Sequence, residues 1–190
     1  RDLTDIYLYE QPWGDLGIDI CLGLPMDIEA SPEMYMFLPE YIEQGFNHAF
    51  IKQNGREIPL VKDTLITYAS TPEADSSSTI TPLIAFTVLL LLGVALTLYE
   101  VNAKKHIRLF DIILFVIVGL LGWVLFALWT ITDHNAAGKN MNLLWAIPLY
   151  FPIVFWLLRK QPASWVKSFF LVTTIIGIVT VLTWFVLPQD

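Results

Sequence analysis

The sequence has little of what many catalytic and nucleic-acid-binding sites require. It contains one cysteine, Cys21, so no disulfide can form within the chain. It has no glycine-rich phosphate loop, no Cys/His spacing suited to a metal and no Gly-x-Ser-x-Gly nucleophile turn. Basic residues are scarce, 11 against 18 acidic ones, which argues against nucleic acid as a partner. We therefore predict no metal site and no cofactor.

Charge and hydrophobicity divide the chain into two parts. Residues 1–79 carry four basic and 14 acidic side chains, whereas residues 80–190 carry seven basic and four acidic ones. Hydrophobic residues make up 55% of the chain and the mean hydropathy is +0.59, more than a soluble domain of this size can bury. We interpret the first part as exposed to water and the second as embedded in lipid.

Four apolar stretches in the second part have the composition of transmembrane helices: Ile80–Tyr99, Leu109–Thr132, Leu143–Leu158 and Ser168–Leu187. Three contain about 20 residues or more, enough to cross a hydrocarbon core of about 30 Å. The third is shorter, contains Pro148 and Pro152, and would reach about 24 Å as a helix, so it has to use flanking residues or thin the bilayer. The predicted fold class is a mostly α-helical membrane protein, with four transmembrane helices after a small α+β segment.

Basic residues in the connecting loops predict the orientation. The first and third loops hold three each: Lys104, Lys105 and Arg108, then Arg159, Lys160 and Lys167. The second loop, Asp133–Asn142, holds only Lys139. By the positive-inside rule the first and third loops are cytoplasmic, and both termini and the second loop lie outside.

The segment before the membrane part is predicted to occupy residues 1–69, followed by a linker at 70–79 and the transmembrane domain at 80–190. Two short helices, Asp2–Tyr9 and Leu16–Leu22, are expected on either side of a break at Gln11–Gly14. Ser31 followed by Pro32 predicts the start of a longer helix.

That longer helix is expected to run towards Phe50 with a kink at Pro39. Beyond it, Asn54-Gly55 between apolar stretches predicts a β-hairpin within residues 49–61, and Leu65–Tyr68 is a candidate third strand. Such a segment buries too little to be stable alone, so we expect it to pack on another domain or chain.

Polar groups are concentrated in the second loop, Asp133–Asn142, where Asp133 precedes His134. Histidine titrates near a pKa of about 6.5, and a neighbouring carboxylate favours its charged form. A His–Asp pair at the membrane surface suits proton transfer or binding of a polar lipid headgroup. The alternative is that these side chains only cap helix ends in interfacial water, and the residues by themselves favour that alternative.

The remaining chemically interesting residues have simpler interpretations. Cys21 lies among apolar residues, which raises the pKa of a thiol and leaves it unreactive. His48 is expected to be structural, and His106 to face lipid headgroups from a basic loop. Asp15 and Asp19 share a helical face, which is weak evidence for a site.

Several phrases occur in a recognisable order: residues 12–19 (PWGDLGID), 22–27 (LGLPMD) and 30–41 (ASPEMYMFLPEY), and later Thr132–His134 followed by Asn142–Trp145. The first three resemble the C-terminal end of the periplasmic domain of the Lnb-type lipoprotein N-acyltransferases. The later stretch is similar to the segment which that family carries between its membrane helices. The resemblance covers about residues 1–60 and 130–148.

The resemblance implies an enzyme, an acyltransferase. Its acyl donor would be a phospholipid and its acceptor the N-terminal cysteine of a diacylated lipoprotein, at the outer face of the bacterial inner membrane. The protein would then be a multi-pass membrane protein with periplasmic N- and C-termini. Such families are thought to use a cysteine nucleophile and a histidine, through a thioester, and we expect both upstream of Arg1, in a catalytic domain or chain. The role is not carried over to Cys21.

Within this chain the second loop, together with Trp145 just after it, supplies the candidate site residues. His134 and Asp133 are candidate supporting residues for catalysis, and Asn140, Asn142 and Trp145 are candidate substrate-binding residues. A second interpretation is a non-enzymatic membrane anchor or scaffold that binds a periplasmic partner. A transporter is disfavoured, because none of the four predicted spans has an ionisable residue near its centre.

Overall fold

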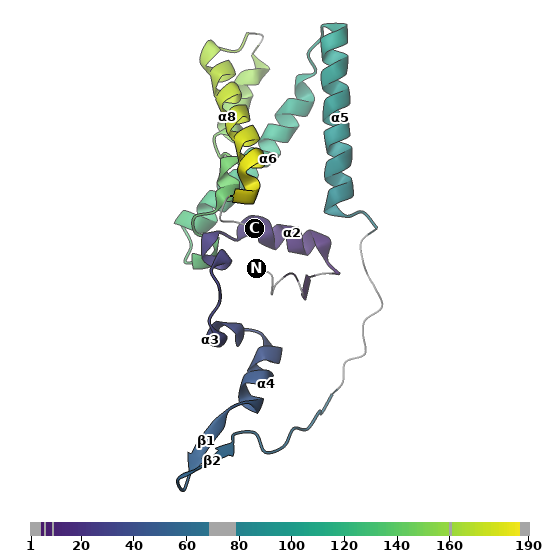
Figure 1. Ribbon diagram of the computed structural model, residues 1–190. Coiled ribbons are helices and arrows are strands. Elements are labelled where there is room, and N and C mark those ends of the chain that lie inside the picture. Colours follow the sequence, from purple (N-terminus) through teal and green to yellow (C-terminus); the bar gives the residue numbers. More distant parts are fainter. Residues whose placement is uncertain (1–4, 6, 9, 69–78, 160, 187–190) are drawn as a thin grey trace. The chain divides into compact units, whose positions relative to one another are not determined.

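The computed structural model shows a mostly helical protein with one small sheet (Figure 1). The structure describes residues 5, 7–8, 10–68, 79–159 and 161–186. The chain forms two compact units, one of residues 28–75 and one of residues 1–27 together with 76–190. The N-terminal residues thus group with the membrane helices. The predicted domain boundaries stay a prediction, and the linker predicted at 70–79 lies outside the described residues apart from Thr79.

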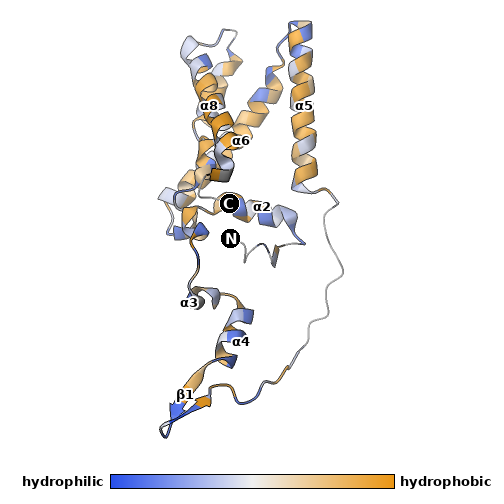
Figure 2. Cartoon of the chain, viewed as in Figure 1, coloured by the Kyte–Doolittle hydropathy of each residue, from blue (hydrophilic) through white to orange (hydrophobic). Residues whose placement is uncertain are grey.

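Three helices are long and apolar enough to cross a membrane: α5 (Pro82–Ala103), α6 (Arg108–Thr130) and α8 (Ser164–Thr183). With 22, 23 and 20 residues they match a hydrocarbon core of about 30 Å. They overlap three of the four predicted spans, and Figure 2 shows them as largely hydrophobic along their length. The protein is therefore a multi-pass membrane protein.

The fourth predicted span, Leu143–Leu158, does not form a helix of membrane length, which corrects the prediction. The region contains the 3-10 turn η3 (Met141–Leu144), the short helix α7 (Tyr150–Val154) and the 3-10 turn η4 (Phe155–Leu158). Pro148 explains the break, because proline lacks an N–H and disfavours a helical conformation in the preceding residue. We call residues 141–158 the broken segment.

The broken segment packs closely on α6 at two glycines. A Cβ on Gly122 would lie 2.1 Å from the carbonyl oxygen of Ala146, and one on Gly119 would lie 2.4 Å from the backbone nitrogen of Phe151. Neither distance is possible for a real side chain. Small residues of this kind let backbones approach closely in membrane proteins. Here they let the irregular backbone of the broken segment lie directly against α6.

Further along, the broken segment is held at the start of α6 and against α8. Nη1 of Arg108 donates hydrogen bonds to the carbonyl oxygens of Leu157 (3.1 Å) and Arg159 (2.7 Å). The ring of Phe115 lies 4.9 Å from that of Tyr150 and 4.7 Å from that of Phe170, which joins α6, α7 and α8. The segment therefore follows α6, and Ala146, Tyr150 and Val154 are its buried hydrophobic residues.

Helix α2 (Pro12–Cys21) runs across the ends of the long helices within the same unit (Figure 1). Nε1 of Trp13 donates to the carbonyl oxygen of Ile80 at 2.7 Å, and its ring lies 6.4 Å from that of Phe86 in α5. Helix α2 thereby contacts the chain where α5 begins.

The predicted break at Gln11–Gly14 is wrong, because α2 begins at Pro12. Proline is favourable at the first helical position, where its missing N–H would have had no partner. In the other predicted helix, Asp2–Tyr9, residues 5, 7 and 8 are helical and the remaining ones lie outside the described residues. After α2 the chain continues through the 3-10 turn η1 (Leu24–Asp27).

In the unit of residues 28–75, the helix start at Ser31 is confirmed, since its hydroxyl accepts a hydrogen bond from the backbone nitrogen of Met34 at 3.4 Å. The single kinked helix is wrong. The chain forms α3 (Pro32–Tyr35) and then α4 (Pro39–Asn47), because Pro39 begins a new helix instead of bending the old one.

The predicted hairpin is confirmed as β1 (Phe50–Gln53) paired antiparallel with β2 (Arg56–Pro59). Asn54 and Gly55 have φ angles of 52° and 78°, as a tight two-residue turn requires. The candidate third strand, Leu65–Tyr68, is not formed, and Leu65 is 85% exposed.

Replacing Gly122 by alanine is expected to lower the free energy of unfolding by about 1–3 kcal/mol, because the new Cβ would overlap the backbone of the broken segment. The control is Gly177→Ala in α8, where a Cβ meets nothing within 4 Å. Thermal unfolding of the two purified proteins in detergent measures the difference. Equal stability of the two variants would contradict the close packing described above.

Candidate functional site

All five residues predicted for the site lie in the chain between α6 and α7, residues 131–149, which we call the outer loop. It contains the short 3-10 turns η2 (Asn135–Ala137) and η3. The outer loop lies at the same end of the membrane helices as α2 (Figure 1).

Asn140 and Asn142 fasten the outer loop to α2. Their Nδ2 atoms both donate to the carbonyl oxygen of Ile20, at 2.8 and 3.1 Å. The two residues are only 3% and 6% exposed. Ile20 is in the last turn of α2, where carbonyl groups have no partner inside the helix. The two amides therefore satisfy a group that the helix itself leaves open.

The same asparagines also organise the turn that holds them. The backbone nitrogen of Asn142 donates to Oδ1 of Asn140 at 2.9 Å, and Oδ1 of Asn142 accepts from Nε1 of Trp145 at 2.9 Å. The three predicted substrate-binding residues thus form one hydrogen-bonded group. Most of their polar atoms are used within the protein.

Gly23 completes the docking between the two segments. Its backbone nitrogen donates to the carbonyl oxygen of Ala136 at 2.8 Å. A Cβ on Gly23 would lie 1.9 Å from the carbonyl oxygen of Gly138, so only glycine fits there. The contact of Gly23 with the outer loop could not be predicted, because nothing local to the sequence indicates it.

His134 and Asp133 differ from the asparagines in being exposed. Nδ1 of His134 lies 3.0 Å from Oγ1 of Thr132, whose hydroxyl donates to the carbonyl oxygen of Leu128 at 2.6 Å. Since that hydroxyl has one hydrogen, Nδ1 has to be the donor to Thr132, and the lone pair of the neutral imidazole is then on Nε2. His134 can therefore accept a proton on an exposed nitrogen.

The structure thus divides the predicted site residues into two groups. Asn140, Asn142 and Trp145 are joined by hydrogen bonds and hold the outer loop together. Asp133 and His134 lie on its exposed side, with Thr132 and not Asp133 as the partner of the imidazole. Their roles in catalysis and substrate binding stay predictions.

Three carboxylates form a cluster at α2. One oxygen from each of Asp5, Asp15 and Asp19 lies within 4.8 Å of the others, which is close enough to share a cation within the described part of the chain. Burial and then the charge of Asp5 raise the pKa of Asp15 above its usual value. Two carboxylates from one helical face were expected, and the third comes from the chain before α2.

The thiol and His48 agree with their sequence interpretations, and the expectation that His106 faces lipid headgroups stays a prediction. Burial raises the pKa of the Cys21 thiol, which keeps it protonated at neutral pH and makes it a poor nucleophile. Nδ1 of His48 bonds the carbonyl oxygen of Gln44 at 2.8 Å, a structural contact at the end of α4. His106 is exposed and pairs with Glu100, with its Nδ1 2.9 Å from the carboxylate.

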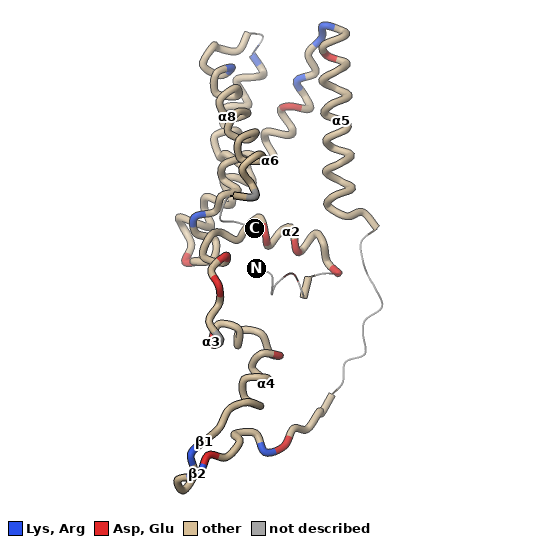
Figure 3. The backbone as a smooth tube through the Cα atoms, in the orientation of Figure 1, with Lys and Arg blue, Asp and Glu red and all other residues tan. Residues whose placement is uncertain are grey.

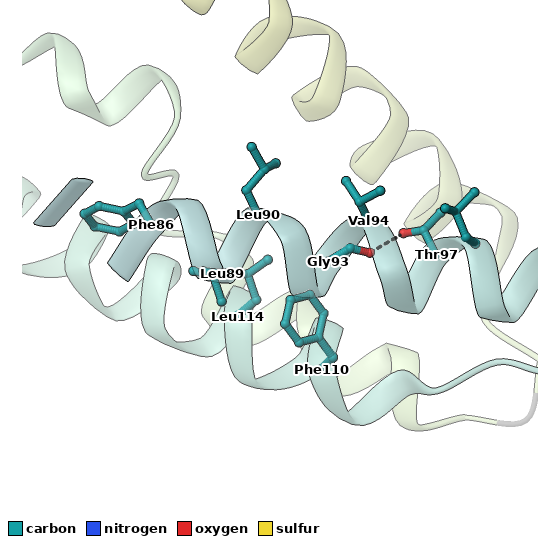
Figure 4. A pocket seen from close by; sticks show the side chains of 9 residues that line it. Phe86, Leu89, Leu90, Gly93, Val94, Thr97, Phe110 and Leu114 are labelled. Carbon is teal, nitrogen blue, oxygen red and sulfur yellow. Dashed lines mark hydrogen bonds between the residues drawn. The ribbon is translucent and has the colours of Figure 1, made fainter. Parts of the chain in front are cut away.

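A cavity of about 500 Å³ lies between α5 and α6 (Figure 4). Figure 4 shows Phe110 of α6 facing Gly93 of α5 and Leu114 of α6 beside Leu89, and a Cβ on Gly93 would lie 3.7 Å from the Phe110 ring. The lining is apolar except for Thr97, whose hydroxyl donates to the carbonyl oxygen of Gly93 at 2.8 Å. A hydrocarbon chain matches this lining.

Replacing Asn142 by aspartate is expected to lower the free energy of unfolding by about 1–3 kcal/mol, because the donor to Ile20 is lost and a charge is buried beside a carbonyl. Asn135→Asp is the matched control, since Asn135 is exposed in the same loop. Limited proteolysis of the loop and thermal unfolding would both report the difference. Identical behaviour of the two variants would show that the amides do not hold the loop.

Comparison with known protein families gives a match for this chain. The family model described as the Lnb transmembrane domain matches residues 74–190. Its name, 5TMH_Lnb, implies five transmembrane helices, against the four expected here and the three long helices observed in the described residues. Comparison with curated proteins gives no match, and comparison with solved structures gives none either. Because the matched region covers more than half of the sequence, the chain belongs to the Lnb transmembrane domain family.

Proposed function

We propose that this chain is the C-terminal membrane part of a lipoprotein N-acyltransferase, which acts in the bacterial inner membrane. It would help to transfer an acyl chain from a phospholipid to the N-terminal cysteine of a diacylated lipoprotein. The observation that carries the proposal is the family match over residues 74–190. The phrases in residues 12–41, outside that match, add support because they resemble the periplasmic domain of the same enzymes.

The reaction proceeds in two steps that conserve the thiol. A cysteine thiolate of the periplasmic catalytic domain attacks the ester carbon of the phospholipid, and the lysophospholipid alkoxide leaves and takes up a proton. The α-amino group of the lipoprotein then attacks the thioester, and the thiolate leaves while the nitrogen gives up a proton to a base. An amide forms in place of the ester, and neither step needs an oxidant or a metal.

Both substrates are anchored in lipid, so the reaction requires that their reacting groups meet at the outer leaflet. The geometry supports a role of this chain in holding them. The cavity between α5 and α6 offers hydrocarbon contacts for an acyl chain. The docked outer loop presents His134 and Asp133 at one end of the helices, where a headgroup would lie. Holding reactants in place in this way contributes to rate without any covalent chemistry.

The orientation follows from the loops. Lys and Arg residues are concentrated at the end of the membrane helices that carries the α5–α6 turn and the start of α8 (Figure 3). By the positive-inside rule this basic end faces the cytoplasm, which puts the outer loop and α2 in the periplasm. His134 then lies on the same side of the membrane as the catalytic domain.

The unit of residues 28–75 supports the presence of a periplasmic partner domain. Large apolar side chains are exposed on it, among them Phe37 at 78% and Phe50 at 66%. An apolar surface of this kind is typical of a segment that packs on another domain. We infer that it completes the catalytic domain that carries the cysteine nucleophile.

Alanine at His134 is expected to lower lipoprotein N-acylation by about 100-fold, the lower end for loss of a general base. Alanine at Asp133 is expected to have a smaller effect, because Thr132 and not Asp133 orients the imidazole. Mass spectrometry of lipoproteins measures the N-acylated fraction in a strain that lacks the gene and is complemented with the full-length protein.

The matched control is Cys21→Ala, which is expected to leave N-acylation unchanged because the Cys21 thiol is half-buried and protonated. Normal N-acylation by His134→Ala at normal protein levels would eliminate the role of the loop. Normal N-acylation in the strain without the gene would instead eliminate the acyltransferase and favour a scaffold.

A further inference from the structure

A polar cavity lies at the basic end of the membrane helices, opposite the outer loop. Its volume is about 600 Å³, and its lining includes Arg108, Lys167 and Gln161 together with the apolar Leu157 and Pro162. The proposed acyl transfer takes place at the other end of the helices and makes no use of this cavity.

Two helices begin at this cavity and contribute positive potential. Helix α6 begins at Arg108 and α8 at Ser164, and neither has a side-chain hydrogen bond from its N-cap residue. The first N–H groups of a helix carry partial positive charge, which favours an anion nearby. Arg108 and Lys167 lie in the first turns of these helices, where a cation is unfavourable on its own. Both charges would gain from a bound anion.

The arrangement holds the Arg108 guanidinium in place. It is fixed by its two bonds to the carbonyl oxygens of Leu157 and Arg159, at the end of the broken segment. A planar guanidinium held in this way is well suited to bind phosphate oxygens.

The carboxylates near the cavity only partly offset these charges. The lining includes one, Asp111, in the first turn of α6. Glu100, in the last turn of α5, pairs at 2.9 Å with the imidazole of His106, which also lines the cavity, and it accepts a hydrogen bond from the backbone nitrogen of Ile107, the N-cap residue of α6. Across the two basic loops and their helix ends there are six basic and two acidic side chains: Lys104, Lys105, Arg108, Arg159, Lys160 and Lys167, against Glu100 and Asp111.

We propose that this cavity binds the phosphodiester headgroup of an anionic phospholipid from the adjacent leaflet. Arg108 and Lys167 contact the phosphate, while Leu157 and Pro162 contact the glycerol and the upper part of the acyl chains. Basic pockets between transmembrane helices on the cytoplasmic side are known to bind acidic lipid headgroups. The apolar part of the lining favours a lipid over free phosphate, which has no hydrocarbon to place there.

Lipid binding to the full-length protein in detergent tests this site, with native mass spectrometry as the readout and phosphatidylglycerol and phosphatidylcholine as the probes. The protein is expected to bind phosphatidylglycerol more tightly than phosphatidylcholine. Lys167→Gln is expected to weaken phosphatidylglycerol binding about fivefold, the effect of removing one basic group near the membrane surface. Lys167→Arg keeps the charge and is expected to bind within about twofold of the unchanged protein.

Lys105→Gln is the matched control, because Lys105 is exposed in the same basic loop but does not line the cavity. It removes the same charge and is expected to weaken binding less than about twofold. Equal weakening by Lys105→Gln and Lys167→Gln would overturn the proposal, because it would show general attraction of the basic loops to anionic lipid and not binding in the cavity. Equal affinity for phosphatidylglycerol and phosphatidylcholine would also overturn it.

A competition experiment distinguishes a site for lipid from a site for a soluble anion. Inorganic phosphate and sodium chloride at the same ionic strength are expected to weaken phosphatidylglycerol binding equally. Stronger displacement by inorganic phosphate would show a site for free phosphate and overturn the assignment to lipid. Thermal unfolding of each variant, compared with the unchanged protein, shows whether a loss of binding comes from loss of fold.

Discussion

The membrane unit depends on one constraint, that backbone polar groups inside hydrocarbon have to be paired or covered by protein. The broken segment does not satisfy this as a free helix, because Pro148 interrupts it. Gly119 and Gly122 solve the problem by leaving room on α6 for the irregular backbone. The aromatic rings of Phe115, Tyr150 and Phe170 pack together and join the segment to α6 and α8. With any larger residue at those two positions, the backbone of the segment could not lie this close to α6.

The need to pair backbone polar groups also shapes the candidate site, outside the long helices. The last turn of α2 has carbonyl groups without helical partners, and the outer loop supplies the amides of Asn140 and Asn142 to one of them. Loop and helix therefore complete each other, although they are separated by more than 100 residues in the sequence. Asp133 and His134 are then among the exposed residues of a loop whose position is fixed by its neighbours.

Much of the fold could be predicted from the sequence, because its strongest signals are local. Long apolar runs indicate α5, α6 and α8, and Asn54-Gly55 indicates the hairpin by the φ angles that such a turn needs. Two of the errors come from proline. The prolines predict a break at Pro12 and a kink at Pro39, whereas in both places proline begins a helix. From the sequence alone a proline at the first position of a helix resembles one that interrupts it.

The site could be predicted only in part. The concentration of polar residues predicts a site in the outer loop. Which of these residues hold the loop and which are exposed depends on where α2 lies. Gly23 was missed for the same reason, since the carbonyl oxygen that excludes a side chain there belongs to Gly138. Contacts between segments so far apart leave no periodic pattern in a single sequence.

Helix α2 has a consequence for dividing this protein into fragments. Through Trp13 it is bonded to Ile80, just before α5, and through Ile20 to the outer loop, so it joins parts of the membrane unit that are distant in the chain. The family match begins at residue 74 and leaves this helix out. A fragment cut at that boundary would lack α2, so the amides of Asn140 and Asn142 would lose their acceptor and the start of α5 would lose its contact with Trp13.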